Sequence, residues 1–525
     1  MTVSAAPASA YAGPANKWAI AVAVSLGALL EVIDTSIVNV ALADIQSSLG
    51  ATLTQVSWVV SSYSIANVII LPLSAWLGQR YGKKNYFIFS LIGFTIASML
   101  CGTATTFPML VVARVIQGLA GGGLLAKAQA ILFETFPKEE QAKAQALFGA
   151  IVIAGPTIGP TLGGYLVTNV DWRWIFFVNL PVGIFAVLMT MAALPKDPEN
   201  RTASRVDWLA IFLLAGGLGS LQTVLEEGQT DDWFQSPFIV MLSISAVVGL
   251  GAFVWRELVT ERPVVDLRVL RYRSLWVGSV LSVVVGMALF GALFAVPLFA
   301  QTMLGYTSQD TGLLLLPGAL ASTVAMPLGA RILRKVEARM MLLGGSIILA
   351  VALLQLNQLT PQTGESNFFW PLIIRSFGTV FMFLPLSLLT LGGVPKKDVA
   401  AASGFYSLTR QLGGSVGVAL LSTLLSQRQA FHRNVLIEKV IPSDSLTMDR
   451  IAAFTHNFLA KGFPLEEARQ QAMSLLDHTV DIQAMVMAFA DTFSATAVLV
   501  FVAMPLILLM PKPDLGNAKA AAEAH

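Results

Sequence analysis

Fourteen apolar segments, each long enough to cross a lipid bilayer, constrain the fold of this chain more than any other feature. A bilayer core requires about 20 apolar residues per helix, and the segments lack the alternation of a membrane β-barrel. Only 12% of the 525 residues are charged, about half of the roughly 25% typical of soluble domains. The sequence therefore predicts an all-α polytopic membrane protein. The segments lie near 18–42, 55–79, 84–104, 107–132, 144–168, 174–194, 207–226, 237–256, 275–301, 310–333, 340–357, 368–392, 400–426 and 487–510.

The distribution of Lys and Arg between the loops predicts how the helices are oriented, because cytoplasmic loops carry the excess of positive charge. If the N-terminus is inside, most of the 33 Lys and Arg residues fall in inside segments, and the short outside loops hold only Arg173. Both termini are therefore expected in the cytoplasm. Residues 1–17 are interpreted as a disordered tail and residues 511–525 as a second cytoplasmic tail.

Composition and motifs argue against several classes of function. The 33 basic and 31 acidic residues leave no basic excess for binding nucleic acid. Cys101 is the only cysteine, which excludes an internal disulfide. The sequence contains no P-loop motif and no convincing catalytic set. The spacings of His432, His456 and His478 fit no zinc motif, so we interpret these as surface residues. We expect neither an enzyme nor a cofactor or metal site.

An internal repeat divides the chain into two parts. The segment 72–84 matches the segment 327–339, and Arg114 corresponds loosely to Arg375. Parallel repeats of six helices are typical of two-halved transporters, in which the site lies near the midplane between the halves. This predicts an N-terminal six-helix half at 18–194 and a C-terminal half at 275–510, with two inserted helices at 207–256. The alternative is a chance match between apolar helices that precede basic loops.

One outside segment, at about 427–484, is much longer than the others. Its stretches 448–459 and 465–476 have the pattern of amphipathic helices. Long loops without structure are uncommon in compact proteins and are usually functional. We therefore expect a small extramembrane helical element, whose role would be to dock a partner.

Six charged residues inside the apolar segments stand out, because a charge there costs roughly 2.5–3.5 kcal/mol on insertion scales and is a functional hypothesis by default. Glu31 and Asp34 share one helix face, so in a poorly hydrated cavity each carboxylate holds a proton more readily. Asp34 and Arg114 are expected at similar depth. They form either a switchable ion pair, for which proton and substrate compete, or a permanent bridge between two helices. The six residues are Glu31, Asp34, Arg114, Lys127, Arg375 and Arg410.

The remaining charges and several aromatic residues are candidates for substrate binding. If Lys127 and Arg375 both face a cavity, they attract an anionic substrate; alternatively, Lys127 snorkels toward the inner interface. Arg410 is expected to be a structural partner of a helix end. Some aromatic residues could line an apolar pocket, although any one such residue more often serves packing than ligand contact. They are Trp58, Tyr63, Phe148, Phe290, Phe294, Phe381, Phe383 and Phe405.

Glycines and prolines in the fifth apolar segment predict a kinked helix with close neighbours. Pro156 and Pro160 interrupt backbone hydrogen bonds, while Gly155 and Gly159 allow another helix to approach. We interpret Gly121–Gly123 in the fourth segment as serving the same close packing.

Taken together, these stretches resemble the major facilitator superfamily and, within it, the 14-helix drug:proton antiporters of the EmrB type. The resemblance covers nearly all of residues 18–510, and its motifs lie at 30–41, 114–118, 155–164 and 172–183. It implies a proton-coupled exporter of amphipathic organic compounds in a bacterial inner membrane. Asp34 would be the main proton carrier and Arg114 its partner, assisted by Glu31.

The resemblance also implies a gate and partner proteins. The superfamily's loop motif corresponds here to Arg80, Gly82 and Lys83, although Gln79 stands where an acid is usual. Relatives of the EmrB type work with a membrane-fused periplasmic adaptor (EmrA-like) and a TolC-like outer-membrane channel, which the segment 427–484 would contact. Two alternatives stay open: a dedicated exporter of one anionic metabolite, such as a fatty acid or siderophore, and a non-transporting sensor or scaffold.

Overall fold

The computed structural model describes residues 16–195, 206–260, 263–441 and 445–510, and within these ranges the regular structure is helical. The tails expected at 1–17 and 511–525 therefore lie almost entirely outside the described residues. The first six predicted segments correspond to α1 (Lys17–Leu49), α3 (Trp58–Tyr81), α4 (Lys83–Gly102), α5 (Phe107–Gly121) with α6 (Leu124–Thr135), α7 (Lys138–Asn169), and α8 (Trp174–Phe177) with α9 (Asn179–Ala193). The short α2 (Leu53–Val56) lies between α1 and α3.

The inserted pair consists of α10 (Trp208–Glu227) and α11 (Pro237–Val259), with the 3-10 helices η1 (Trp233–Gln235) and η2 (Leu267–Arg271) nearby in the chain. The last six segments lie in α12 (Arg273–Met303), α13 (Ser308–Ile332), α14 (Ala338–Leu356), α15 (Glu365–Leu391), α16 (Val399–Ile437) and α18 (Leu465–Ile507), with α17 (Ser445–Ala460) before the last. Twelve described spans are long and apolar enough to cross a membrane, and α12 has a shorter apolar part at Arg273–Leu289. The fourteenth segment lies in α16, where Arg410 and several polar residues lower the hydropathy.

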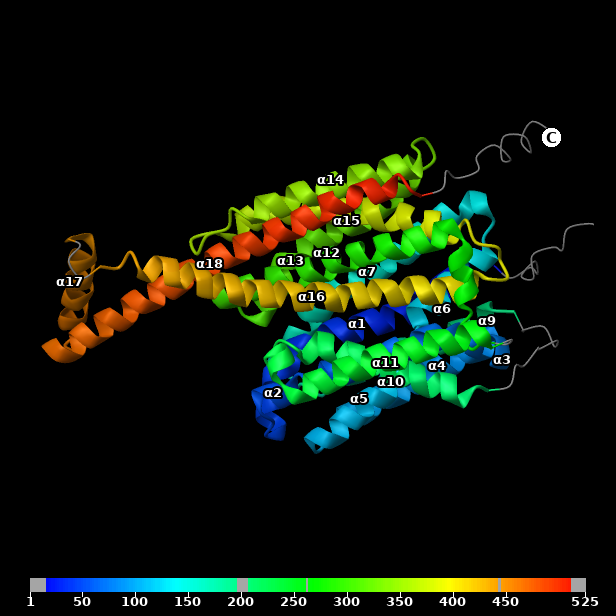
Figure 1. The fold of residues 1–525 in the computed structure, drawn as a ribbon, viewed down its shortest axis with the longest axis horizontal. Coiled ribbons are helices and arrows are strands. Elements are labelled where there is room, and N and C mark those ends of the chain that lie inside the picture. Colours follow the sequence, from blue (N-terminus) through cyan, green and yellow to red (C-terminus); the bar gives the residue numbers. More distant parts are fainter. Residues whose placement is uncertain (1–15, 196–205, 261–262, 442–444, 511–525) are drawn as a thin grey trace, which may run out of the picture.

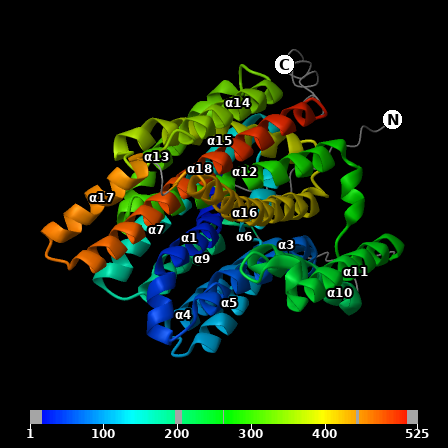
Figure 2. The same cartoon turned by 60° about the vertical axis from the view of Figure 1, so that its left-hand side comes forward.

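The two six-helix halves repeat one arrangement, as the sequence repeat predicts. In the N-terminal half α1 packs along α7, and in the C-terminal half α12 packs along α16. The halves meet where α7 packs against α13 and where α3 and α6 pack against α16. Apolar side chains fill the first of these contacts, including Ala146 of α7, Met326 of α13 and Phe383 of α15. The inserted helices lie at the side of the bundle, where α10 covers α3 (Figure 2).

One end of the bundle collects basic side chains, and we call it the basic end. Lys17 pairs with Glu140 at 2.5 Å, and Lys83 pairs with Glu134 at 2.6 Å. Lys396 of the C-terminal half donates to the Glu134 carbonyl at 3.3 Å. The basic end is therefore also a place where the two halves are joined.

Two helices extend far beyond the opposite end of the bundle, as Figure 1 shows for α16 and α18. The segment expected as a loop at 427–484 consists of the ends of these helices with α17 packed on α18. Arg433 of α16 joins the two helices by pairing with Asp477 at 2.8 Å and Asp481 at 2.5 Å. These pairs supply polar contacts between the parts of α16 and α18 that project from the bundle.

His432 corrects one expectation from the sequence. It is buried between α16 and α18, where its ring nitrogen lies 2.8 Å from Asp491. Arg428 pairs with the same carboxylate. The interpretation of His432 as a surface residue is therefore wrong, because the helical pairing in this segment was not foreseen.

Candidate functional site

Asp34 and Arg114 form an ion pair in the interior of the N-terminal half. Arg114 Nη1 lies 2.5 Å from Asp34 Oδ2, and the two side chains are 1% and 0% exposed. The Arg114 Nε donates to the Val59 carbonyl at 2.9 Å. The second Asp34 oxygen accepts hydrogen bonds from Gln117 at 2.8 Å and Asn179 at 3.1 Å. The carboxylate is thus surrounded by three donors from three other side chains.

Neighbouring side chains complete the enclosure of this pair. The Arg114 guanidinium lies 4.3 Å from the centre of the Tyr63 ring, a cation–π contact, and Phe176 lies on another side at 5.9 Å. Ser98 accepts from Asn179 at 3.1 Å, and Cys101 donates to Gln117 at 3.4 Å. A charged pair that is desolvated this completely is stable only while all its partners stay in place.

Glu31 lies one helical turn from Asp34 and makes different contacts. One oxygen accepts from Asn67 of α3 at 2.7 Å, and the other accepts from the Leu125 backbone N–H at 2.8 Å. Both donors are uncharged. The charges of Lys127 and of Arg410, which belongs to the other half, act on this carboxylate. Glu31 therefore connects α1, α3, α6 and the interface between the halves.

The Leu125 N–H is available because the fourth apolar segment is broken into α5 and α6. Gly123, with φ of 76°, occupies the left-handed region and precedes α6 without a side-chain cap of its own. The first N–H groups of a helix lack internal partners and carry partial positive charge. Glu31 supplies the missing acceptor from another helix. The close packing expected of Gly121–Gly123 is present, since a Cβ on Gly121 would overlap Phe94 and one on Gly122 would overlap Ile70. The same glycines also end α5 and start α6, which was not expected.

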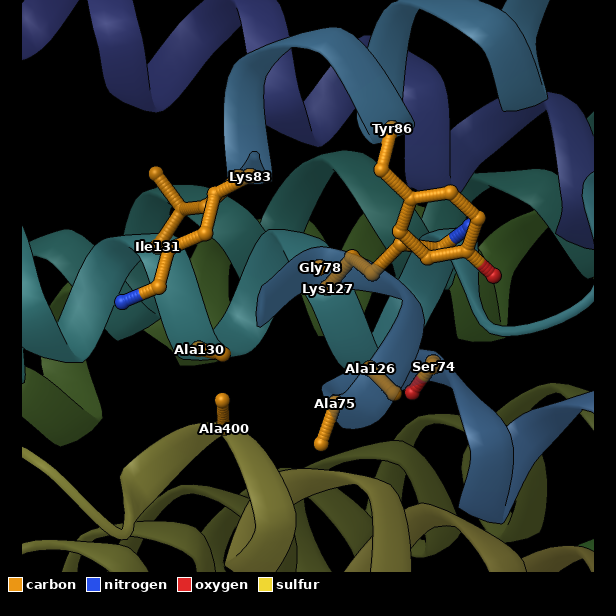
Figure 3. Close-up of a pocket in the computed structure, with 10 residues that line it drawn as sticks. All are labelled: Ser74, Ala75, Gly78, Lys83, Tyr86, Ala126, Lys127, Ala130, Ile131 and Ala400. Atoms are coloured by element: carbon orange, nitrogen blue, oxygen red, sulfur yellow. The ribbon is translucent and has the colours of Figure 1, made fainter. Parts of the chain in front are cut away.

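Lys127 lies on α6 beside a small cavity of about 30 Å³ between the halves (Figure 3). Its Nζ donates to Ser90 at 2.7 Å and lies 4.0 Å from the centre of the Tyr86 ring. The side chain is 9% exposed. Ala400 of α16 closes the cavity from the C-terminal half. Lys127 therefore lines the cavity with its stem while its amine points toward α4 of its own half, where it has a defined partner.

The two arginines of the C-terminal half take different positions. Arg410 is 6% exposed, and its guanidinium lies over the rings of Phe383 at 5.4 Å and Tyr406 at 5.6 Å. Because Tyr406 lies one turn earlier on α16, Arg410 lies along its own helix and does not cap a helix end, contrary to expectation. Arg375 is partly exposed on α15, in the half opposite Lys127.

The aromatic candidates also separate by burial. Tyr63 contacts Arg114, and Phe148 lies in the apolar core of the N-terminal half, so in this structure neither is open to a ligand. Trp58 and Phe405 are partly exposed, whereas Phe381 packs against Phe377 at 5.8 Å. The side chains of Phe290 and Phe294, on α12, lie outside the described part of the chain.

The residues expected to gate or shape the bundle lie at helix junctions. Gly82 has φ of 88° between α3 and α4, a conformation that favours glycine. Lys83 pairs with Glu134, and Arg80 lies 5.5 Å from the Trp76 ring. These contacts place the loop motif at the basic end.

The glycines of α7 bring this helix against the face of α1 that carries Val32 and Ser36. A Cβ on Gly155 would lie 2.8 Å from Val32, and Ser36 donates to the Gly155 carbonyl at 3.2 Å. Gly159 is in similarly close contact with Ser36. Pro156 and Pro160 lie within α7, which stays helical from Lys138 to Asn169.

Sequence reasoning missed the amides that hold the carboxylates. Gln117, Asn179 and Asn67 are 0%, 1% and 4% exposed, and each bonds to Asp34 or Glu31. A polar amide inside an apolar segment was the available signal, because such groups require a partner when buried. Their partners became apparent only from the packing of distant helices.

The chain is similar to known proteins along almost its entire length. The family model described as Major Facilitator Superfamily matches residues 24–418. The chain is 33% identical to the multidrug export protein EmrB of Escherichia coli K12, over 96% of this chain and 97% of that protein. It is 32% identical to the fatty acid resistance protein FarB of Neisseria gonorrhoeae, with coverages of 95% and 97%.

Solved structures bear on the fold alone. The structure of the human organic anion transporter MFSD10 superposes with a TM-score of 0.60 at 13% identity, covering 94% of this chain and 100% of that one. The helical arrangement described above is therefore that of a two-halved transporter. The chain belongs to the Major Facilitator Superfamily, in the group of exporters that includes EmrB and FarB.

Proposed function

We propose that this chain is a proton-coupled exporter of amphipathic organic compounds, which exchanges protons at Glu31 and Asp34 for a substrate bound between the halves. The observation that carries the proposal is the position of Glu31. A buried carboxylate caps α6 and faces Arg410 of the other half, so its charge affects how the halves contact each other. Ionisable groups inside a membrane protein are expensive and mark ion pathways.

A proton on Glu31 removes a negative charge between Lys127 and Arg410 and weakens the cap of α6. The α6 helix takes part in closing the basic end, where Ser403 of α16 donates to the Ala126 carbonyl at 2.7 Å. Loss of the Glu31 charge therefore acts on a contact between the halves. Proton entry supplies about 2.3 kcal/mol per charge per 100 mV of membrane potential, and this energy is available to change the contact between the halves.

Asp34 takes part by a different route. Its carboxylate is bonded to a guanidinium and two amides, so proton binding requires Arg114 to move away. We propose that Arg114 and a proton exchange on Asp34 during the cycle, while Glu31, held by uncharged donors, binds its proton first. This order differs from the expectation that Asp34 is the main carrier.

The proposed substrate carries a negative charge. Lys127 and Arg410 outnumber the single carboxylate of Glu31, on which both charges act, and Arg375 adds a third positive charge on α15. Opposite charge favours binding in a poorly hydrated site. A dedicated exporter of one anionic metabolite, such as a fatty acid or siderophore, is the second candidate, and this excess of positive charge favours it. A sensor or scaffold with this fold would exchange no protons for substrate.

The proposed location is a bacterial inner membrane with both termini in the cytoplasm, since the basic end then faces inside. The projecting α16, α17 and α18 would lie in the periplasm. There they would meet a membrane-fused adaptor of the EmrA kind, connected to a TolC-like channel. Deleting residues 445–460 should leave transport by the purified protein in proteoliposomes intact but abolish drug resistance in cells that contain the adaptor. Loss of transport in proteoliposomes as well would contradict a docking role.

The function is tested by proton release from the purified protein in weakly buffered detergent near neutral pH. An anionic amphiphile and, separately, a cationic dye are added to the wild type, Glu31→Gln and Asp34→Asn. Release with the anion that is lost in Glu31→Gln supports the proposal. Release with the dye alone keeps the antiporter but rejects the anionic preference, and no release with either contradicts proton coupling.

A further inference from the structure

The inserted helix α10 ends in two carboxylates, and neither belongs to the six-helix halves. Glu227 is 3% exposed and accepts from Ser57 at 3.0 Å and from Ser61 at 2.6 Å, both at the start of α3. Glu226 accepts from Gln222 of its own helix at 2.6 Å. The two acids thus lie where α10 packs on the N-terminal half.

The hydrogen bonds around these acids leave acceptors without donors. Each serine hydroxyl has one proton, and those of Ser57 and Ser61 go to Glu227. The hydroxyls of Ser61 and Ser64 also lie close to Glu226. Glu226 Oε2 and the Oε1 of Gln222 are buried with no hydrogen-bond partner. Gln222 is 0% exposed. Buried polar atoms that lack partners are costly and require an explanation.

The surroundings supply no positive charge. Within the described ranges neither Glu226 nor Glu227 forms an ion pair with Lys or Arg. The titratable groups on the elements packed against this site are Tyr63 on α3, Arg80 and Tyr81 at the far end of α3, Arg256 and Glu257 at the far end of α11, and Asp231 and Asp232 just beyond α10. On α16, the residues from Ser415 to Thr423, which hydrogen-bond to the end of α10 and the turn after it, include no titratable group, and Arg410 lies more than one turn before them.

We propose that Glu226 is a second proton-binding site of this protein, built by the inserted helix and distinct from the Glu31 and Asp34 site. A proton on Glu226 turns one of the unpartnered acceptors into a donor and removes a charge that no cation balances. Glu227 differs from Glu226 in that both of its oxygens accept hydroxyl hydrogen bonds.

The location of Glu226 links its proton to the relative position of the halves. The same Gln222 that bonds to Glu226 also donates to Ser415 of α16 at 2.7 Å. Further along, Gln229 donates to the Ser422 carbonyl at 3.2 Å and Trp233 to Thr423 at 3.2 Å. The end of α10 therefore contacts α3 of one half and α16 of the other. Movement of the halves changes the donors around Glu226, and this consequence rests on the proposed exchange of protons for substrate.

Infrared difference spectra between acidic and alkaline pH test the site directly on the full-length protein. Glu226→Gln should lose one C=O stretching band of a protonated carboxyl, and Glu226→Asp should keep it at a shifted frequency. The matched controls are Glu227→Gln, in the same cluster, and Glu257→Gln, a buried glutamate on α11. Both should retain the band. An unchanged spectrum in Glu226→Gln overturns the proposal, as does loss of the band in Glu227→Gln alone.

Two further measurements distinguish a proton site at Glu226 from a metal-cation site and from the proposed function of the whole protein. Spectra recorded in NaCl and in choline chloride should agree; a band that disappears only with sodium would make this a metal-cation site and overturn the assignment to a proton. Proton counts per substrate in proteoliposomes should be lower for Glu226→Gln than for the wild type, with exchange retained. If the wild type exchanges no proton for substrate, the proposed function is wrong. The infrared spectra still show whether Glu226 binds a proton.

Discussion

Removing Arg114 tests whether its pair with Asp34 is a switch or a permanent bridge. In Arg114→Met the Asp34 carboxylate stays buried, with Gln117 and Asn179 as its only donors. Removing one partner of a buried ion pair typically costs about 3–5 kcal/mol. Because each 1.36 kcal/mol corresponds to a tenfold change, the folded population relative to the unfolded one falls at least a hundredfold.

The double variant Arg114→Met with Asp34→Asn removes both charges. An uncharged amide and an apolar side chain of similar length replace the pair, and such replacements are often neutral or stabilising. We therefore expect thermal stability in detergent to drop sharply in the single variant and to return close to that of the wild type in the double variant. The surface pair Lys17 and Glu140, with exposed fractions of 40% and 33%, is the control. Lys17→Met should change stability by less than about 1 kcal/mol.

Transport decides between the two interpretations. If the pair is a switch, the double variant is stable but its proton-driven transport in proteoliposomes is lost. A double variant that recovers both stability and transport would show that the pair is only a bridge, and the role of Asp34 in coupling would be refuted. A single variant as stable as the wild type would refute the reasoning about desolvation.

Three further outcomes follow from particular contacts. Glu31→Gln should abolish proton release induced by substrate in weakly buffered solution while leaving binding of the substrate measurable by fluorescence, since Gln keeps an acceptor for α6 but cannot ionise. Gly82→Ala should lower the free energy of unfolding by about 1–2 kcal/mol because Gly82 has a φ of 88°. The control Gly344→Ala should leave stability unchanged, because Gly344 has open space around it. Thermal unfolding measures both. Although burial opposes ionisation, the Ala210 amide and the Arg256 guanidinium hold the pKa of Asp207 below its usual range. The stability that ionised Asp207 provides is therefore complete at neutral pH and is lost as the pH falls below about 4. Comparing acid titrations of unfolding for the wild type and Asp207→Asn checks this, and identical curves would contradict it.

The membrane-spanning segments could be predicted from the sequence, because membrane helices follow from local hydropathy alone. The sequence also indicated Asp34 and Arg114, since buried charge inside an apolar segment is visible residue by residue. The break at Gly121–Gly123 was missed because three glycines are equally compatible with close packing and with a helix end. Both apply here, and the helix end also depends on Glu31, 90 or more positions earlier in the chain, supplying the acceptor.

For a related reason, the sequence does not single out the acids of α10. Glu226 and Glu227 end an apolar segment, and their hydropathy is that of a loop start. Only the packing of α10 on Ser57 and Ser61 shows that Glu227 is buried. Hydropathy registers the cost of burying a charge but cannot identify hydroxyl donors contributed by a helix far away in the sequence.

The length of α18 has a mechanical consequence. Its 43 residues form a continuous rod of about 64 Å at 1.5 Å per residue, roughly twice the thickness of the hydrocarbon core. A rigid rod that pivots within the bilayer amplifies motion at its free end. For a tilt of about 10°, the tip beside α17 would travel on the order of 8 Å from a pivot near mid-membrane. When one half tilts, the displacement near the substrate is small, whereas the projecting tip of α18 moves a larger distance in the aqueous compartment beyond the membrane.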